Sequence, residues 1–135
     1  MFVIDASATL AVCFADEAGD IADRLLERLE HERAVAPAHW PLEVANALRT
    51  AERRGRLQSD DLPKLRGLLG ALPVEIVPVE LGSAMGDVLD MARAFGLSVY
   101  DAAYLGLAAV RGIPLATADE RLRQAALRAG VELAA

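Results

Sequence analysis

Short apolar runs alternate along this chain with longer segments in which apolar positions recur at helical spacing. The strand-like runs cover residues 2–4, 34–36, 74–79, 114–117 and 131–133. Between them, apolar residues three and four positions apart indicate helices with one apolar face. Short strands that alternate with helices are typical of a parallel sheet with crossover helices. The pattern therefore predicts an α/β sandwich with five strands.

Helical spacing and helix-stop residues locate the connecting helices. Leucines and alanines predict helices around residues 21–29, 42–48 and 62–69, and later over 88–95, 102–110 and 121–129. Gly96 follows the first of these later helices, as expected for a residue just past a helix end. Crossover connections are right-handed, so the carboxyl ends of the strands meet at one edge, where ligands bind in such sheets.

Composition favours a single domain that spans residues 1–135, since 135 residues with 54% hydrophobic content suffice for one core. The longest apolar run is far shorter than the roughly 18 residues of a membrane span, and the N-terminus lacks the basic region of a signal peptide. We therefore expect a cytoplasmic protein without a membrane partner. Cys13 is the only cysteine, so neither an internal disulfide nor a cysteine-rich zinc site is possible.

Charge is uneven along the chain. The net charge of −6 argues against tight, nonspecific binding to a phosphate backbone, which needs many cations. Four arginines nevertheless fall within eight residues: Arg49, Arg53, Arg54 and Arg56. They have two interpretations: a solvated helix end, where the helix dipole favours cations, or a basic rim that contacts RNA phosphates.

Four acidic residues interrupt apolar stretches at predicted strand ends or helix starts: Asp5, Glu43, Asp101 and Asp119. Asp5 and Asp119 follow strands, and Glu43 opens the helix after the second strand. Asp101 opens a helix that no strand directly precedes, so its position at the same edge is inferred less directly. If the fold brings the four together, their repulsion must be relieved by protons or by a cation. At neutral pH a divalent metal is the simpler answer.

Each acid also has a structural explanation, because carboxylates in the first turn of a helix favour the dipole and cap backbone amides. Thr117 and Glu120 match a capping box, and Ser98 with Asp101 resembles one. Four independent caps, however, have no reason to carry acids at one edge of one sheet. The set therefore favours function over capping.

Clustered carboxylates suit magnesium or manganese, which prefer hard oxygen ligands and retain water. Such a metal activates a bound water and stabilises charge on phosphoryl oxygens, so phosphodiester hydrolysis is the chemistry that fits best. Ser7 and Thr117 lie two residues from an acid and would either orient a metal-bound water or phosphate, or serve as caps. Asn46 lies on nearly the same helix face as Glu43 and could bond to it or to substrate.

Four segments resemble the motifs of one family, in its order and approximate spacing: residues 3–7 (VIDAS), 43–48 (EVANAL), 100–105 (YDAAYL) and 117–119 (TAD). Together they make the chain similar, over essentially its whole length, to the PIN domain in the small bacterial form of the VapC toxins. These toxins belong to type II toxin–antitoxin pairs.

The resemblance implies a three-layer α/β/α fold with a five-stranded, mainly parallel sheet, and a ribonuclease that depends on Mg²⁺ or Mn²⁺. It implies that the four acids form the catalytic site, with Asp5 and Asp101 binding metal directly. Asp119 would act through water or at a second metal. Thr117 and, in support, Ser7 and Asn46 would complete the site.

The resemblance also implies partners: a homodimer, and a cognate VapB-type antitoxin with which it forms a heterotetramer or larger assembly. The antitoxin's C-terminal segment would occupy the site, with an arginine meeting the acids, since a guanidinium engages carboxylates bidentately. Two other functions stay open: a nuclease that acts on DNA or branched nucleic acid, and a noncatalytic module whose acids dock basic partners.

Overall fold

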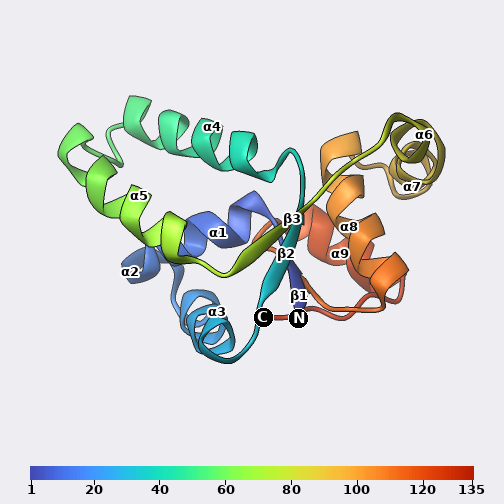
Figure 1. Ribbon diagram of the computed structural model, residues 1–135, viewed down its shortest axis with the longest axis horizontal. Coiled ribbons are helices and arrows are strands. Elements are labelled where there is room, and N and C mark those ends of the chain that lie inside the picture. Colours follow the sequence, from blue (N-terminus) through green and yellow to red (C-terminus); the bar gives the residue numbers. More distant parts are fainter.

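A parallel sheet crosses the centre of the molecule (Figure 1). The computed structural model covers residues 1–135 and describes all of them except the side chains of residues 17 and 18. Within this described chain the sheet has four strands in the order β3-β2-β1-β4: β1 (Phe2–Ile4), β2 (Ala34–Pro37), β3 (Val74–Val77) and β4 (Leu115–Ala116). Val3 of the inner strand β1 lies opposite both Val35 and Leu115. The inner strands are fully buried, as expected for a parallel sheet covered on both faces.

Helices cover both sides of this sheet, which gives the predicted three-layer α/β/α arrangement (Figure 1). On one side lie α1 (Ala6–Cys13), α2 (Ala15–Ala18), α3 (Asp20–His31), α4 (Trp40–Arg53), the short turn η1 (Ser59–Asp61) and α5 (Leu62–Ala71). On the other lie α6 (Leu81–Ser83), η2 (Ala84–Val88), α7 (Leu89–Phe95), α8 (Val99–Arg111) and α9 (Glu120–Arg128).

The predicted fifth strand, residues 131–133, is wrong as a strand. Leu133 makes only an isolated parallel bridge with Leu115, supported by hydrogen bonds from Leu115 N to the Glu132 carbonyl (2.8 Å) and from Ala134 N to the Leu115 carbonyl (2.9 Å). The neighbouring strand β4 is only two residues long. At the start of the predicted strand, the Val131 N–H donates to the Ala126 carbonyl of α9 (2.9 Å), so the chain there closes the helix and pairing with the sheet is limited to Leu133.

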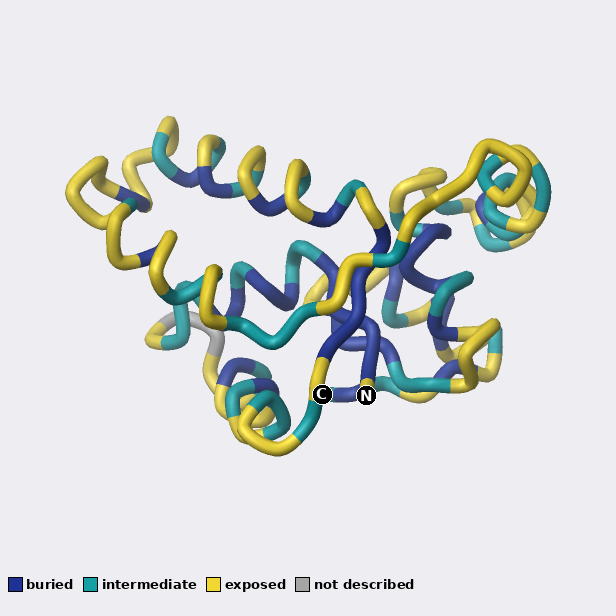
Figure 2. The backbone as a smooth tube through the Cα atoms, in the orientation of Figure 1, coloured by how far each residue is buried: buried dark blue, intermediate teal, exposed yellow. Residues whose placement is uncertain are grey.

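Helix α4 connects the core to the edge of the sheet where Asp5 lies. Its buried face consists of Trp40, Val44, Leu48 and Ala51, at helical spacing, and is dark blue in Figure 2. Trp40 Nε1 donates a hydrogen bond to Thr9 Oγ1 (3.0 Å), and Thr9 Oγ1 donates to the Asp5 carbonyl (2.8 Å). A buried tryptophan therefore fixes the start of α4 against the first turn of α1.

The carboxyl ends of the inner strands lie at one edge of the sheet because all strands run in parallel. Asp5 directly follows β1, and Thr117 directly follows β4. The Asp5 backbone N–H donates to the Ala116 carbonyl (3.1 Å), so β1 and β4 stay hydrogen-bonded up to their carboxyl ends. No helix in the described part of the chain combines the length and apolarity that a membrane span requires.

Candidate functional site

Asp5 is the most buried of the four predicted acids, with 4% of its surface exposed. Its Oδ1 accepts hydrogen bonds from Ser7 Oγ (2.7 Å) and from the Ala8 backbone N–H (2.8 Å), and its Oδ2 accepts one from Thr117 Oγ1. Burial raises the pKa of Asp5 to about 6, although these donors act in the opposite direction. The carboxylate is therefore held in one orientation in surroundings that disfavour its negative charge.

Ser7 and Thr117 join the loops after β1 and β4 into one hydrogen-bonded cluster. Their hydroxyl oxygens are 3.1 Å apart, although the residues are 110 positions apart in sequence. Ser7 Oγ also accepts from the Ala118 N–H (2.8 Å), and Thr117 Oγ1 from the Asp119 N–H (3.1 Å). Ser7 and Thr117 thus both donate to Asp5 and both accept from the backbone that leads to Asp119.

The structure reassigns the capping interactions. The alternative in which Thr117 caps α9 is wrong, because Asp119 is the N-cap and accepts from the Leu122 N–H (3.0 Å). Asp5 likewise caps α1. The similarity of residues 98–101 to a cap is confirmed, since Ser98 caps α8 and accepts from the Asp101 N–H (3.1 Å). Two of the four acids therefore do cap helices. Glu43 and Asp101 cap no helix, although both lie in a first turn, where the helix dipole favours an acid.

Glu43 lies in the first turn of α4 and contacts two residues that the sequence did not single out as functional. The buried Tyr104 donates from its hydroxyl to Glu43 Oε1 (2.6 Å), and His39 Nε2 lies 3.4 Å from the same oxygen. Burial raises the pKa of Tyr104 well above its usual range, and the Glu43 carboxylate raises it further. The hydroxyl therefore remains a donor at every physiological pH.

Asp101 connects the acids electrostatically. Its pKa is raised by partial burial and then by the charges of Asp119 and Glu43. The charge of Asp101 in turn contributes to the raised pKa of Asp5. The structure thus connects the four predicted acids, hereafter the acidic edge (Asp5, Glu43, Asp101 and Asp119), through the charge of Asp101.

The acidic edge suits a hard divalent cation by its chemistry. Its donors are carboxylate and hydroxyl oxygens, and a cation would relieve the desolvation and mutual repulsion that raise the pKa values of Asp5 and Asp101. Among the described residues, no three His, Cys, Asp or Glu side chains form a group that could hold an ion by themselves. An ion held here by fewer protein ligands would need water to complete its coordination, as is usual for Mg²⁺.

The predicted RNA-contacting arginines lie away from this edge. Glu43 and Arg53 are ten residues apart on α4, which corresponds to about 15 Å along a helix. Arg49 pairs with Glu52 (2.8 Å), and the Arg56 guanidinium lies 4.3 Å from the centre of the Phe14 ring. We call these four arginines, Arg49, Arg53, Arg54 and Arg56, the arginine end. Asn46 is exposed, and no contact with Glu43 is seen.

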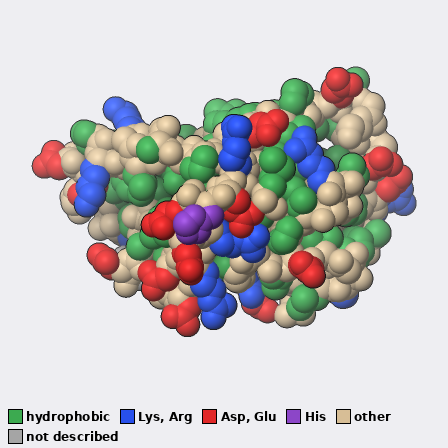
Figure 3. Space-filling view, turned by 60° about the horizontal axis from the view of Figure 1, so that its bottom comes forward, with side chains coloured by type: hydrophobic (Ala, Val, Ile, Leu, Met, Phe, Trp, Pro, Cys, Tyr) green, Lys and Arg blue, Asp and Glu red, His purple; other side chains and the backbone are tan. Residues whose placement is uncertain are grey.

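A different cation acts on the acidic edge. Arg121, in the first turn of α9, lowers the pKa of Asp101 against the larger effects that raise it. Its guanidinium donates to the Gly96 carbonyl (2.8 Å), which fixes it beside the loop that precedes α8. The sequence signal that could have found Arg121 is its position two residues after Asp119. Figure 3 shows the side of the molecule toward the amino ends of the strands, where acidic and basic side chains are interspersed.

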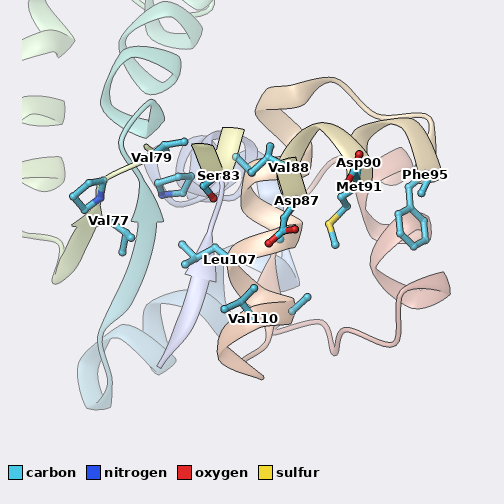
Figure 4. A pocket seen from close by; sticks show the side chains of 16 residues that line it. Val77, Val79, Ser83, Asp87, Val88, Asp90, Met91, Phe95, Leu107 and Val110 are labelled. Carbon is cyan, nitrogen blue, oxygen red and sulfur yellow. The ribbon is translucent and has the colours of Figure 1, made fainter. Parts of the chain in front are cut away.

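Two apolar cavities lie outside the acidic edge. One, of about 570 Å³, is lined by α8 and by the segment from β3 to α7, including Val77, Val88, Met91, Leu107 and Val110 (Figure 4). The other, of about 470 Å³, lies between α4 and α5. None of the four acids lines either cavity. The chemistry of the acids therefore belongs to the open edge of the sheet and not to an enclosed apolar pocket.

The fold and this edge define an α/β protein with a parallel sheet and a carboxylate cluster at the strand ends, and comparison with known proteins places it in a family. The model of the PIN domain matches residues 2–127. The chain belongs to the PIN domain family.

Individual relatives resemble the chain over most of its length. It is 32% identical to ribonuclease VapC3 of Pyrobaculum aerophilum over 126 residues, which cover 90% of this chain and 92% of that one. It is 33% identical to ribonuclease VapC12 of Mycobacterium tuberculosis over 124 residues, or 92% and 91% of the two chains. The crystal structure of PAE2754 from Pyrobaculum aerophilum superposes with a TM-score of 0.69 at 25% identity, covering 92% of this chain and 84% of that one.

Proposed function

We propose that this protein is a metal-dependent endoribonuclease, and that it is the toxin of a toxin–antitoxin pair. The observation that carries the proposal is the acidic edge of a PIN domain, where the charges of Asp119 and Glu43 raise the pKa of the partly buried Asp101 and the charge of Asp101 contributes to the raised pKa of the buried Asp5. The similarity to two proteins named ribonuclease VapC supports RNA as the substrate. We place the reaction in the cytoplasm.

Asp5 and Asp101 would hold Mg²⁺ or Mn²⁺, with Glu43 and Asp119 completing the charge of the site. A bound ion would supply an activated water and stabilise charge on the phosphoryl group. The protein's own contribution is orientation: Ser7, Thr117 and the Ala8 N–H fix both oxygens of Asp5, so they need little rearrangement when ligands arrive. Arg121 supplies a positive charge near Asp101 that can meet a phosphate oxygen.

The proposed partners follow from the same site. A cognate VapB-type antitoxin would neutralise the toxin by placing a basic segment on the acidic edge, where its charge replaces that of the metal. We further propose that the toxin forms a homodimer and a heterotetramer or larger assembly with the antitoxin. Size measurement of the purified toxin with and without the antitoxin tests this assembly.

Cleavage of total cellular RNA by the purified, antitoxin-free protein tests the activity. We expect discrete products with Mg²⁺ or Mn²⁺, and none with a chelator or with Asp101→Asn. The chelator removes the metal ion, and the substitution removes a proposed metal ligand. Single-stranded and branched DNA serve as competing substrates. Cleavage of DNA in preference to RNA would favour the alternative nuclease, and absence of both cleavage and metal binding would favour a noncatalytic module that docks basic partners.

A further inference from the structure

Glu43 lies among the proposed metal-binding acids, but the donors that fix Asp5 do not reach it. Its side chain is 33% exposed, and glutamate has one more rotatable bond than aspartate. A flexible, partly exposed carboxylate would bind a cation weakly, because ordering it on binding costs conformational entropy. Some other group must therefore hold Glu43 if it is to contribute.

Tyr104 meets this requirement by position and by burial. It lies on α8 one helical turn after Asp101, and its side chain is 1% exposed. Its hydroxyl donates to Glu43 Oε1 over 2.6 Å, across 61 positions of sequence. A buried hydroxyl needs an acceptor, so this bond also satisfies Tyr104 itself.

The surroundings of Tyr104 restrict its ring as well. The His39 ring packs edge-on against it, with centroids 4.9 Å apart. His39 is held in turn by its Nε2, which lies 3.1 Å from the Tyr100 carbonyl. His39 and Glu43 at the start of α4 are thus joined to Tyr100 and Tyr104, which lie on either side of Asp101 in the sequence of α8.

The hydrogen bond leaves one carboxylate oxygen available. Among the described residues, Oε1 of Glu43 contacts Tyr104 and His39, whereas no hydrogen bond to Oε2 is seen. Hydrogen-bonded outer groups orient the ligands of metal sites in this way, and their loss lowers metal affinity by about 10- to 100-fold.

We infer that Tyr104 is a positioning residue, which orients the Glu43 carboxylate so that its second oxygen faces a divalent cation bound at the acidic edge. This inference rests on the proposed function, because it assumes that the edge binds a metal. Tyr104 itself contacts neither the metal nor the RNA in this arrangement. Its effect passes entirely through Glu43.

The test compares two tyrosines on the same helix. Tyr104→Phe removes only the buried hydroxyl, whereas Tyr100→Phe removes an exposed hydroxyl for which no contact is seen and is the matched control. Direct Mn²⁺ binding is measured for each purified protein by electron paramagnetic resonance, without RNA. We expect the Kd for Mn²⁺ to rise about 10-fold in Tyr104→Phe and to stay unchanged in Tyr100→Phe.

A double-mutant cycle with Glu43→Gln separates positioning from general damage. If Tyr104 acts through Glu43, Tyr104→Phe weakens Mn²⁺ binding in the native background but has little further effect beside Glu43→Gln. Equal weakening in both backgrounds would overturn the inference. The metal-induced rise in melting temperature, taken from each variant's own metal-free value, keeps a loss of stability from being mistaken for a loss of binding.

The RNA cleavage assay gives a second readout. We expect the Mn²⁺ concentration for half-maximal cleavage to rise about 10-fold in Tyr104→Phe, while saturating Mn²⁺ restores the maximal rate. Unchanged Mn²⁺ binding in Tyr104→Phe, with normal binding by the unmodified protein, would refute the role of Tyr104 and leave the proposed function standing. If the unmodified protein binds no Mn²⁺ at all, the proposed function and this inference both fail.

Discussion

The acidic edge and the arginine end meet on one helix, because Glu43 lies in the first turn of α4 and Arg53 at its end, yet the two clusters differ physically. At the start of α4, Trp40 is buried and Glu43 receives a hydrogen bond from a buried tyrosine. At its end, Arg53 and Arg54 are exposed to solvent. Both clusters are equally visible in the sequence, but only the first is built into the core. Burial and not charge density therefore distinguishes a cluster that the fold organises from one at an exposed helix end.

The largest effect on RNA cleavage is expected from neutralising the buried Asp5. We expect Asp5→Asn to lower RNA cleavage at least about 100-fold, because a proposed direct metal ligand should matter more than the outer groups whose loss costs 10- to 100-fold. Asparagine still caps a helix, so α1 should persist. Asp23→Asn, at an exposed acid on α3, is the control in the same cleavage assay. Full activity of Asp5→Asn would remove Asp5 from the site.

The same substitution should have the opposite effect on stability in metal-free protein. The pKa of Asp5 is raised from 3.8 to about 6, so the folded state binds a proton that the unfolded state has lost between these values. Stability is therefore lost as pH rises from about 4 to about 6, by as much as about 3 kcal/mol from this group.

Urea unfolding with chelator present checks this sign. The Asp5→Asn variant should match the native protein near pH 4 and exceed its free energy of unfolding at pH 7. If the native protein is instead the more stable of the two at pH 7, the hydrogen bonds from Ser7, Ala8 and Thr117 outweigh the burial of the charge.

A third prediction concerns the contact that holds the start of α4. Thr9→Val keeps the shape of a fully buried side chain but leaves Trp40 Nε1 without its acceptor and the Asp5 carbonyl without the Thr9 hydroxyl. An unpaired buried donor costs about 1–3 kcal/mol, so we expect a loss of that size in the free energy of unfolding. The control is Thr50→Val near the end of α4, which should change the free energy of unfolding by less than about 0.5 kcal/mol.

The smallest effects are expected at the arginine end. Arg53→Gln combined with Arg54→Gln should leave the free energy of unfolding within about 0.5 kcal/mol, because both side chains are exposed. If the two arginines contact RNA phosphates, the slope of log affinity against log salt should become shallower by about 1.4, or about 0.7 for each contact.

Binding of a labelled single-stranded RNA over a range of salt concentrations gives this slope, in the inactive Asp101→Asn background. Arg24→Gln on α3 is the control for loss of an exposed arginine. An unchanged slope would mean that Arg53 and Arg54 belong to a solvated helix end, and that local cations such as Arg121 serve the RNA instead.

The sequence alone determined the order of the strands β1 to β4, the main later helices, and the position of each acid at a strand end or helix start, but it did not predict α1 or α2. These are local properties: apolar spacing shows which face of a segment is buried, and an acid after a short apolar run marks the end of a strand. The same local reading was wrong for the last strand, because the Val131 N–H closes the end of α9 and does not join the sheet. It was also wrong for the cap of α9, where Asp119 and not Thr117 accepts the backbone bond.

Only the tertiary structure decided which side chains meet. Ser7 and Thr117 are 110 positions apart but share the same carboxylate, and Tyr104 reaches Glu43 across 61 positions. The raised pKa of Asp5 is likewise a tertiary property, because desolvation by the surrounding core causes it. One amino-acid sequence by itself shows neither the contacts between distant positions nor the depth at which a charge is buried. These depend on how the helices pack against both faces of the sheet.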